Sequence, residues 1–572
     1  MENQKVARVF QEIGDILQLQ GVNRFRYLAY YKAVQIVESL SLDVRKIYDD
    51  PEKQFTDIPG IGSALASKIV EILETGQCKE HQELLNGFSK GLLELLTIRG
   101  LGPKKVKLFY DVLGIDDIHK LKAAAEKGSL AELPRMGEKS QAEILKAIID
   151  HEKHRERIIL HSARVTADAM VEYMKTCEEV TKVQFAGSLR RGRETIGDVD
   201  ILATGKDHAK IIQHFIDHSD VQDVLAHGET KASVVNGSGF QIDFRVVEAK
   251  SFGSALYYFT GSKNHNIHAR KLAIGKGMKV NEYGIFKGDE WLAGETESDI
   301  FKVLGLPYII PELREDNGEI EAGFNDALPD SIEVDDIRGD LHMHTTASDG
   351  KNSLEEMVGE AKKLGYEYIA ITDHSPSVRV AHGLSNERVL DHIARIDALN
   401  EKIDGMTILK GAEIDILADG SLDYPDEILA KLDMVNISVH SKFNLPADEQ
   451  TARVIKGLSN PYVTMLCHPT GRIVKQREPI LIDIVEVARA AKAHGVAMEI
   501  NGSSRLDLSP GNAKLAKEQG CKFLINTDSH RVMHLQNMRF GVTLARRGWI
   551  EKTDVLNTLP LAQMLSYFNR PQ

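Results

Sequence analysis

Two histidines and an aspartate stand close together in residues 340–350, which read "DLHMHTTASDG". His342 and His344 are two residues apart in a run that begins like a strand, so their imidazoles would lie on one face of it. Asp349 follows His344 by five residues, in a predicted loop. Imidazole and carboxylate groups gathered in this way predict a bound metal ion.

Further potential ligands follow at or near the ends of predicted strands in later βα units. They are His374, Glu413, His440, His468, Asp528 and His530. In an α/β barrel such strand ends meet at one edge, where sites assemble. A single histidine is more often structural, but without a metal each of these residues would need its own buried partner. Because no thiol is among them, the set favours Zn, Mn or Fe.

A second pattern occupies residues 185–204, "FAGSLRRGRETIGDVDILAT". Gly187 and Ser188 lie at a predicted strand-to-helix turn, where backbone N–H groups can cradle a phosphate. Arg190 and Arg191 stand beside this turn and can pair with the same phosphate. The turn is therefore a candidate nucleotide-binding element.

Three aspartates accompany this turn. Asp198 and Asp200 are two apart on a predicted strand, so their carboxylates share one face. Asp243, in "FQIDFRVV", can complete the cluster from another strand. Three carboxylates on one surface repel one another unless cations occupy the site. An isolated pair is usually a solvated strand end, but this pair, with Gly-Ser before it and Asp243 after it, predicts a Mg²⁺ site for nucleotidyl transfer.

Glycine-containing turns repeat in the first 150 residues. Residues 55–73 and 95–113 are the clear copies, and residues 130–145 are a weaker third. Each copy places a glycine turn before an amphipathic helix, which is typical of a helix-hairpin-helix. The glycines of the first two turns are Gly60, Gly62, Gly100 and Gly102. Backbone N–H groups there could bind DNA phosphate independently of base sequence. A plain packing element, or one that binds protein, is the alternative.

The remaining chain divides into further regions. Short apolar strands begin near residue 160 and indicate an α/β pattern. Residues 316–337 are acidic and weakly periodic, which suggests a linker or lightly structured connector. From residue 338, strands alternate with helices, which predicts parallel βα units in a number that suggests a barrel.

The composition of the 572-residue chain restricts its possible ligands and cellular compartment. Residues 316–572 carry 28 basic and 38 acidic side chains, −10 of the net charge of −13, so the preceding part is near neutral and can contact phosphate. The sequence shows neither a bilayer-spanning apolar run nor a secretory signal, which predicts a cytoplasmic protein with no membrane partner. Its four cysteines are far apart, which fits a reducing compartment and argues against a disulfide framework or a cysteine zinc site.

Residues 1 to about 315 resemble a family X DNA polymerase. The hairpins are similar to its first two subdomains, the Gly-Ser and Asp198–Asp200 motif to its palm, and "YYFTGSKNHNIHAR" (257–270) to its thumb. The resemblance implies that Asp198, Asp200 and Asp243 are catalytic Mg²⁺ ligands, that dNTPs are substrates, and that gapped or primed double-stranded DNA is bound. It implies nucleotide contacts by Gly187, Ser188, Arg191, Gly197, Tyr258, Phe259, Gly261 and Asn266. It also implies that Arg270 contacts the template strand.

Two lysines stand at positions where the family has functional residues. Lys263 stands where the best-known relatives carry an acidic residue, which puts its nucleotide contact in doubt. Lys68, in "LASKIVEIL", matches the position of a Schiff-base nucleophile for abasic sugar phosphate. A solvated surface lysine is the alternative reading of Lys68.

Residues 338–572 resemble the PHP (polymerase and histidinol phosphatase) family. The resemblance implies a distorted seven-stranded barrel with up to three Mn²⁺ or Zn²⁺ ions. One ion would take His342, His344, Glu413 and Asp528. A second would share Glu413 and take His440 and His468, and a third would take Asp349, His374 and His530. Such a site suits phosphoester hydrolysis.

The expected fold is therefore multidomain: an N-terminal all-α helix-hairpin-helix region, an α+β nucleotidyltransferase palm with thumb, and a C-terminal α/β distorted seven-stranded PHP barrel. The predicted boundaries are 1–90, 91–155, 156–255 (palm), 256–315 (thumb), 316–337 (linker) and 338–572 (PHP). Bacterial polymerases of this layout imply short-gap filling in DNA repair with 3′→5′ exonuclease action, and abasic-site or 3′-end cleavage as further options. Two alternatives stay open: a DNA-binding polymerase whose PHP part is a non-catalytic support, and a nucleotidyltransferase acting on small substrates.

Overall fold

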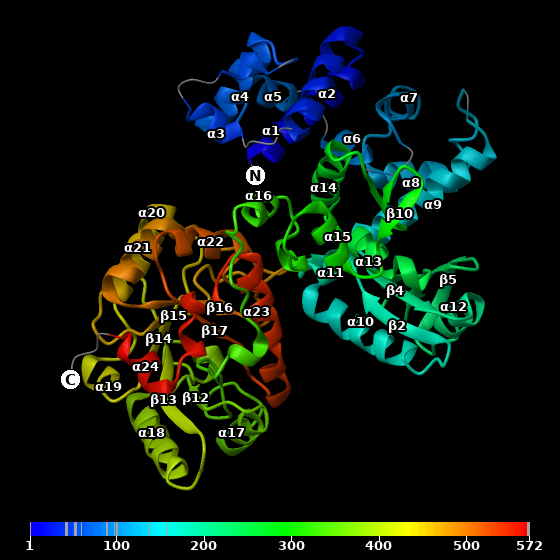
Figure 1. Ribbon diagram of the computed structural model, residues 1–572. Coiled ribbons are helices and arrows are strands. Elements are labelled where there is room, and N and C mark those ends of the chain that lie inside the picture. The colour runs from blue at the N-terminus through cyan, green and yellow to red at the C-terminus, as the bar shows by residue number, and fades with distance from the viewer. Residues whose placement is uncertain are drawn as a thin grey trace. The chain divides into compact units, whose positions relative to one another are not determined.

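The computed structural model describes residues 2–39, 44–50, 54–58, 60–86, 90–96, 98, 101–134, 136–155 and 157–568. The chain forms two compact units, Met1–Glu156 and Arg157–Gln572 (Figure 1).

The first unit is all helical and has two apolar cores. One core is built from α1 (Glu2–Leu19), α2 (Arg24–Ser39), α3 (Val44–Tyr48), η1 (Phe55–Asp57), α4 (Ser63–Thr75) and the chain leading into α5 (Lys79–Asn86). The other is built mainly from α6 (Lys90–Leu95), α7 (Pro103–Leu113), α8 (Ile118–Glu126) and α9 (Glu138–Arg155). Helix α6 begins at Lys90, and the predicted boundary at residue 90 stays a prediction.

Helices α4 and α7 each begin directly after a predicted glycine turn. Gly62 is the N-cap of α4 and Gly102 is the N-cap of α7, both with extended backbone. Gly60 has a φ of +96°, a backbone conformation that favours glycine. Gly100, with Pro59 and Arg99 of the same turns, lies outside the described residues.

The second unit opens with the predicted palm. Its five-stranded sheet has the order β2-β4-β7-β6-β5. The strands are β2 (Val180–Phe185), β4 (Val199–Gly205), β5 (Val221–His227), β6 (Lys231–Asn236) and β7 (Gln241–Val246). Helices α10 (Leu160–Met174) and α12 (His208–Ile216) contact this sheet, and the short β1 (Ile158–Ile159) and β3 (Thr195–Ile196) pair separately. The parallel pair β4 and β7 places Asp200 directly opposite Asp243.

The predicted thumb follows as helices and a small sheet. The elements are η2 (Ala249–Ser251), α13 (Phe252–Thr260), α14 (Lys263–Gly275), β8 (Lys279–Asn281), β9 (Gly284–Lys287), β10 (Glu290–Ala293), α15 (Glu297–Leu304) and η3 (Pro311–Leu313). Buried side chains of α13, α14 and α15 form a core with β8 and β9.

The segment 316–337, predicted as a linker or lightly structured connector, contains α16 (Glu319–Phe324) and η4 (Val334–Asp336). Glu319 is fully buried, 2.7 Å from Nδ1 of the equally buried His265 on α14. Its carboxylate also accepts hydrogen bonds from the backbone N–H groups of Asp316 and Asn317. An acidic composition suggested solvated chain, but this acidic residue finds its partners inside the fold.

The C-terminal region forms a seven-stranded parallel sheet in sequence order, β11 to β17. The strands are β11 (Gly339–Asp340), β12 (Tyr368–Ile371), β13 (Thr407–Asp415), β14 (Met434–Ser438), β15 (Met465–Leu466), β16 (Ala497–Asn501) and β17 (Phe523–Asn526). The intervening α-helices are α17 (Leu354–Lys363), α18 (Asn386–Asn400), α19 (Asp426–Leu429), α20 (Ala447–Leu458), α21 (Ile484–His494) and α22 (Pro510–Glu518). The last helices are α23 (Met538–Arg547) and α24 (Leu561–Ser566). Figure 1 shows α17, α18, α20 and α21 around the outside of the strands.

The barrel is nearly closed by a single bridge between its two edges. Met343 pairs with Ser529 in parallel, and the backbone N–H of His344 donates to the carbonyl of Ser529 at 2.8 Å. The strand predicted to carry both His342 and His344 is shorter than expected, because β11 ends at Asp340. The bridge still keeps the alternation, with Met343 in the apolar core and the two histidines in the candidate metal cluster.

No helix in the described ranges is long and apolar enough to cross a membrane. All four cysteines are free thiols. Cys78, Cys467 and Cys521 are buried and Cys177 is partly buried.

Candidate active sites

The palm aspartates lie at the start of the central parallel strand pair. Asp200 is the second residue of β4, Asp243 faces it on β7, and Asp198 immediately precedes β4. Asp243 accepts hydrogen bonds from the Ser233 hydroxyl and from Nε2 of Gln241, the latter at 3.1 Å. Sequence reasoning placed Asp198 on the strand itself, whereas the structure places it one residue before.

Electrostatics mark this cluster as a cation site. Burial, together with the nearby charges of Asp198 and Asp243, raises the pKa of Asp200 to about 7. Divalent cations relieve such repulsion, and hard carboxylate oxygens are the ligands that Mg²⁺ prefers. The donor set therefore fits Mg²⁺.

The Gly-Ser turn packs directly on this cluster. Gly187 begins the short helix α11 (Gly187–Arg190) with a φ of +62°, and a Cβ there would lie 2.2 Å from Oδ2 of Asp200. Only glycine allows the turn to approach the carboxylate so closely. Ser188 follows as the second residue of α11, and Gly197 lies in the bend before β4, beside the guanidinium of Arg157.

Arg191 reaches from this turn to the thumb. Its Nη1 donates to the carbonyl of Thr260, and its Nε donates to Glu315 at 3.1 Å. A Cβ on Gly261 would lie 3.2 Å from the same Nη1, and Gly261 has a φ of +69°. The structure therefore brings together the predicted triphosphate-binding arginine and the predicted glycine of close approach.

The remaining thumb residues predicted to contact nucleotide or DNA form one group. Tyr258 and Phe259 meet edge to face at 5.1 Å, and Arg270 lies 5.8 Å from the Tyr258 ring. Asn266 is 6% exposed and donates to the carbonyl of Tyr258 at 2.7 Å, so it must change partners to reach a base edge. Lys263 begins α14 and is exposed.

Arg190, predicted beside the phosphate turn, instead joins palm to thumb. Its guanidinium pairs with Glu297 at 2.8 and 2.5 Å, and Arg314 adds a third hydrogen bond to that carboxylate at 2.6 Å. Burial by itself raises the pKa of Glu297, but Arg314 and Arg190 outweigh it and lower the pKa to about 2. The buried carboxylate is therefore charged at neutral pH and holds the two guanidinium groups.

Replacing Glu297 with glutamine should lower the free energy of unfolding by about 3 kcal/mol at pH 7, because two buried cations lose their carboxylate. Since the pKa is below its usual 4.5, this stabilisation is present above pH 4.5 and is lost as the pH falls through about 2. Urea denaturation at pH 7 and pH 3 measures the difference. Tryptophan fluorescence reports on this region, because Trp291 lies on β10 and Trp549 packs on the thumb core.

The exposed Glu290 on β10 offers the matched control, and Glu290→Gln should change little. The gap between the wild-type protein and Glu297→Gln should narrow at pH 3. An equal gap at both pH values would contradict the assignment of the buried charge.

In the barrel, Glu413 is the centre of the predicted metal cluster. It lies near the end of β13, is 1% exposed, and its two carboxylate oxygens face histidines from other strands. The distances are 2.7 Å to His468, 3.1 Å to His374, 3.3 Å to His440, 3.4 Å to His342 and 3.5 Å to His344. One carboxylate among these imidazoles can bridge two metal ions.

The predicted ligands fall into groups whose donor atoms lie within 4.8 Å of one another. These groups are His342, His344 and Asp528; His342, Glu413 and His468; His374, Glu413 and His440; and His344, Asp349, His374 and His530. All nine predicted residues are present. Two residues differ from the resemblance-based assignment. His374 approaches Glu413 as well as Asp349. His344 belongs to the group with Asp349, His374 and His530 as well as to the group with His342 and Asp528.

The cluster passes a direct test of fit for metal ions. Buried imidazole nitrogens without a hydrogen-bond partner occur on His342, His344, His374, His440 and His468. Unpaired buried nitrogens are costly unless something binds them. Burial by itself raises the pKa of Glu413 and of Asp528, but the surrounding histidines hold both pKa values well below their usual range. Imidazole nitrogens gathered around ionised carboxylates are the donors that Zn²⁺ and Mn²⁺ take.

Sequence reasoning missed the groups that hold these ligands. Glu499 on β16 lies 2.7 Å from Nδ1 of His342 and accepts from the backbone N–H of His468 at 2.7 Å. Arg505 pairs with Asp528 at 3.1 Å and has a buried Nη1 without a partner. Asp415, two residues after Glu413, accepts from the backbone N–H of His440. A carboxylate inside the apolar strand "VAMEIN" was the available signal for Glu499.

Replacing Glu499 with glutamine should weaken metal binding at this cluster by about 10- to 100-fold, because the carboxylate orients the His342 ring. Titrating Mn²⁺ while following phosphoester hydrolysis measures this as a higher half-saturating concentration, with activity recovered at high Mn²⁺. The exposed Glu478 provides the control variant, Glu478→Gln. A loss of activity that excess Mn²⁺ does not restore would contradict the orienting role.

Lys68, the predicted lyase residue, lies on α4 of the first unit. Its Nζ forms an ion pair with Glu80 at 3.0 Å, and Arg26 and Tyr30 bind the same carboxylate. A reaction as a free amine would first require this pair to break. Lyase activity stays a prediction that borohydride trapping on incised abasic DNA, with Lys68→Ala as control, would test.

Family models match five segments of the chain, all between residues 1 and 503. A DNA polymerase beta palm matches residues 157–239 and a DNA polymerase beta thumb matches residues 255–315. A helix-hairpin-helix domain matches residues 1–78, a SAM-like helix-hairpin-helix tandem residues 92–148, and a PHP domain residues 340–503. The fold and the two sites thus define a polymerase of the beta type joined to a PHP domain.

Relatives agree with this division. DNA polymerase/3′-5′ exonuclease PolX of Bacillus subtilis (strain 168) is 36% identical over 575 residues, which cover 100% of both chains. A probable phosphatase of Thermoanaerobacter sp. (strain X514) is 34% identical over 232 residues, 38% of this chain and 89% of that protein. DNA polymerase lambda of Rattus norvegicus is 28% identical over 352 residues, 55% of this chain and 56% of that protein. The chain belongs to the PolX family, the family X DNA polymerases that carry a PHP domain.

Proposed function

We propose that this protein fills short gaps in DNA by template-directed synthesis and removes nucleotides from 3′ ends by metal-dependent hydrolysis. The observation that carries the proposal is the presence of two separate sites, a palm carboxylate cluster and a PHP imidazole–carboxylate cluster. A cytoplasmic location is part of the same proposal, supported by the free cysteines and by the DNA substrate. The domain boundaries predicted from the sequence are also part of this proposal.

At the palm, Asp198, Asp200 and Asp243 would hold Mg²⁺, which when bound activates the primer 3′-hydroxyl and stabilises the leaving pyrophosphate. The turn at Gly187 and Ser188 would place the triphosphate beside these carboxylates, because the turn already packs on Asp200. Arg191 would add a charged hydrogen-bond donor to the triphosphate.

The thumb residues would place the sugar and base of the incoming nucleotide. Gly261 has no side chain, which allows close approach at the sugar, with Tyr258 and Phe259 on the helix just before it. Asn266 and Arg270 would contact the base pair and the template strand.

At the PHP site, the nine clustered side chains would hold up to three metal ions. We propose Mn²⁺ as the ion that supports exonuclease action, with Zn²⁺ as the alternative. Such ions, when bound, supply an activated water and stabilise charge at phosphorus. Arg505 would bind the scissile phosphate, because its guanidinium lies beside Asp528 and keeps a buried Nη1 free of protein partners.

The helical unit would bind the DNA backbone. Among the residues that the structure describes, none outside the adjoining backbone comes within 4 Å of a Cβ added at Gly62 or Gly102, so this packing does not explain these glycines. The first N–H groups of α4 and α7 have no carbonyl before them in the helix, and a phosphate can accept from them. Such contacts predict DNA binding that does not depend on base sequence and weakens with salt.

Primer extension on gapped DNA tests the proposal. A 5′-labelled primer next to a one-nucleotide gap should lengthen by one residue when the complementary dNTP and Mg²⁺ are added. Turnover of free nucleotides without any extension would replace this proposal with a nucleotidyltransferase for small substrates. Extension without Mn²⁺-dependent shortening would reduce the PHP domain to a structural support.

A further inference from the structure

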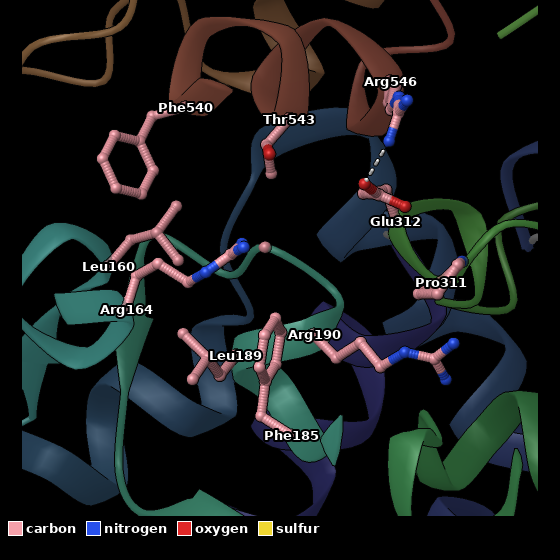
Figure 2. A pocket seen from close by; sticks show the side chains of 11 residues that line it. Leu160, Arg164, Phe185, Leu189, Arg190, Pro311, Glu312, Phe540, Thr543 and Arg546 are labelled. Carbon is pink, nitrogen blue, oxygen red and sulfur yellow. Dashed lines mark hydrogen bonds and ion pairs between the residues drawn. The ribbon is translucent and has the colours of Figure 1, made fainter. Parts of the chain in front are cut away.

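Helix α23 of the PHP domain contacts the palm, and one of its residues reaches the nucleotide-binding turn. A Cβ on Gly192, directly after that turn, would lie 2.1 Å from Cγ2 of Thr543 on α23. Figure 2 shows Thr543 and Arg546 projecting from α23 toward palm and thumb side chains, with the ion pair from Arg546 to Glu312 drawn. Helix α23 therefore packs directly against the residue that follows the nucleotide-binding turn.

Arg547 is the residue of α23 that binds this turn. Its Nη1 donates to the backbone carbonyl of Arg191 at 2.6 Å and to Oε1 of Glu315 at 3.1 Å. The same Oε1 accepts from Nε of Arg191 at 3.1 Å. Arg547 thus holds both the main chain of Arg191 and the carboxylate that orients its side chain.

This network is largely removed from solvent. The side chains of Arg547, Arg191 and Glu315 are 9%, 14% and 15% exposed. Burial by itself raises the pKa of Glu315, but Arg191 and Arg547 outweigh it and hold the pKa below its usual value. The Glu315 carboxylate is therefore charged at neutral pH. It accepts a hydrogen bond from Nε of Arg191, and the carbonyl of Thr260 accepts one from Nη1 of Arg191. Two of the three guanidinium nitrogens of Arg191 are thus held in place.

We propose that Arg547, a PHP-domain residue, is a positioning residue for DNA synthesis at the palm, acting through Glu315 and Arg191 on the binding of the dNTP triphosphate. This inference rests on the proposed polymerase function. It makes the PHP domain a part of the polymerase nucleotide site, separately from its own metal cluster.

Other arginines on α23 provide the contrast. Arg539 pairs with Asp168 on α10 at 2.7 Å, and Arg546 pairs with Glu312 at 3.0 Å. Neither ion pair includes a residue of the nucleotide-binding turn. A role in holding the two domains together belongs to all three arginines, whereas a role in orienting Arg191 belongs to Arg547.

Steady-state kinetics of single-nucleotide gap filling test the inference. Arg547→Ala should raise KM for dNTP by about tenfold with kcat within about twofold of wild type. Arg539→Ala should leave both values unchanged, and Arg547→Lys should recover part of the loss. Glu315→Gln combined with Arg547→Ala should be no worse than Arg547→Ala alone, because both act through Arg191.

Hydrolysis of bis(p-nitrophenyl) phosphate with Mn²⁺ should be equal in wild type and Arg547→Ala, which shows that the variant is folded at its PHP site. Equal KM changes in Arg539→Ala and Arg547→Ala, or an unchanged KM in Arg547→Ala, would overturn the inference while leaving the polymerase proposal intact. A wild-type protein that does not extend gapped DNA would overturn both.

Discussion

Replacing Asp200 with alanine should reduce nucleotide addition to a DNA primer by at least about 10³-fold, while hydrolysis at the PHP site continues. Asp200 faces Asp243 across the parallel strand pair, follows Asp198 by two residues, and packs closely against Gly187. Burial, together with the nearby charges of Asp198 and Asp243, raises the pKa of Asp200 to about 7. Single-turnover extension on a one-nucleotide gap with saturating dNTP measures the effect.

The matched control is Asp223→Ala, which removes an exposed carboxylate from the edge strand β5 of the same sheet. It should extend primers at the wild-type rate. If Asp200→Ala retained more than a tenth of the wild-type rate, the palm cluster would not be the site of synthesis.

Replacing Glu413 with glutamine should have the corresponding effect on the barrel, with phosphoester hydrolysis reduced by about 10³-fold. Its carboxylate faces imidazoles from several strands and is the group best placed to bridge metal ions. An amide supplies one neutral oxygen in place of two charged ones, so the cluster loses negative charge and a bridging ligand. Metal content of the purified protein, measured by mass spectrometry, should fall together with hydrolysis.

An exposed glutamate of the same domain, Glu427 on α19, provides the control Glu427→Gln. Gap filling should survive in both variants. Full metal content in Glu413→Gln combined with normal hydrolysis would mean that Glu413 is not a ligand.

Most of the candidate site residues could be predicted from the sequence. Each of them lies either in a short local motif or at the end of one of the regularly repeated strands. In a parallel sheet, residues that follow successive strands meet at one edge, so the strand-end ligands could be gathered into one site without coordinates. The resemblance to the PHP family then assigned Glu413, His440 and His468 to one ion. The Gly-Ser turn and the aspartates at 198 and 200 are likewise close in sequence. The barrel and the palm followed from these patterns.

Contacts between distant residues could not be predicted in the same way. The position of Arg190 near Gly187 predicted that it binds phosphate. Its partner in the structure is Glu297, which lies 107 residues away in another subdomain. Glu499 read as part of an apolar strand, and only the fold shows that it supports His342 from 157 residues away. Charged residues of this kind look unremarkable in sequence, because their partners are fixed by packing.

We propose that two independent sites of this protein act on one DNA end. The most direct test incubates a 5′-labelled primer on one-nucleotide-gapped DNA with Mn²⁺, with and without dNTPs, using wild type, Asp198→Ala and His344→Ala. We predict that extension is lost only in Asp198→Ala and that shortening is lost only in His344→Ala. Loss of both activities in either single variant, or shortening that survives in His344→Ala, would contradict two separate sites.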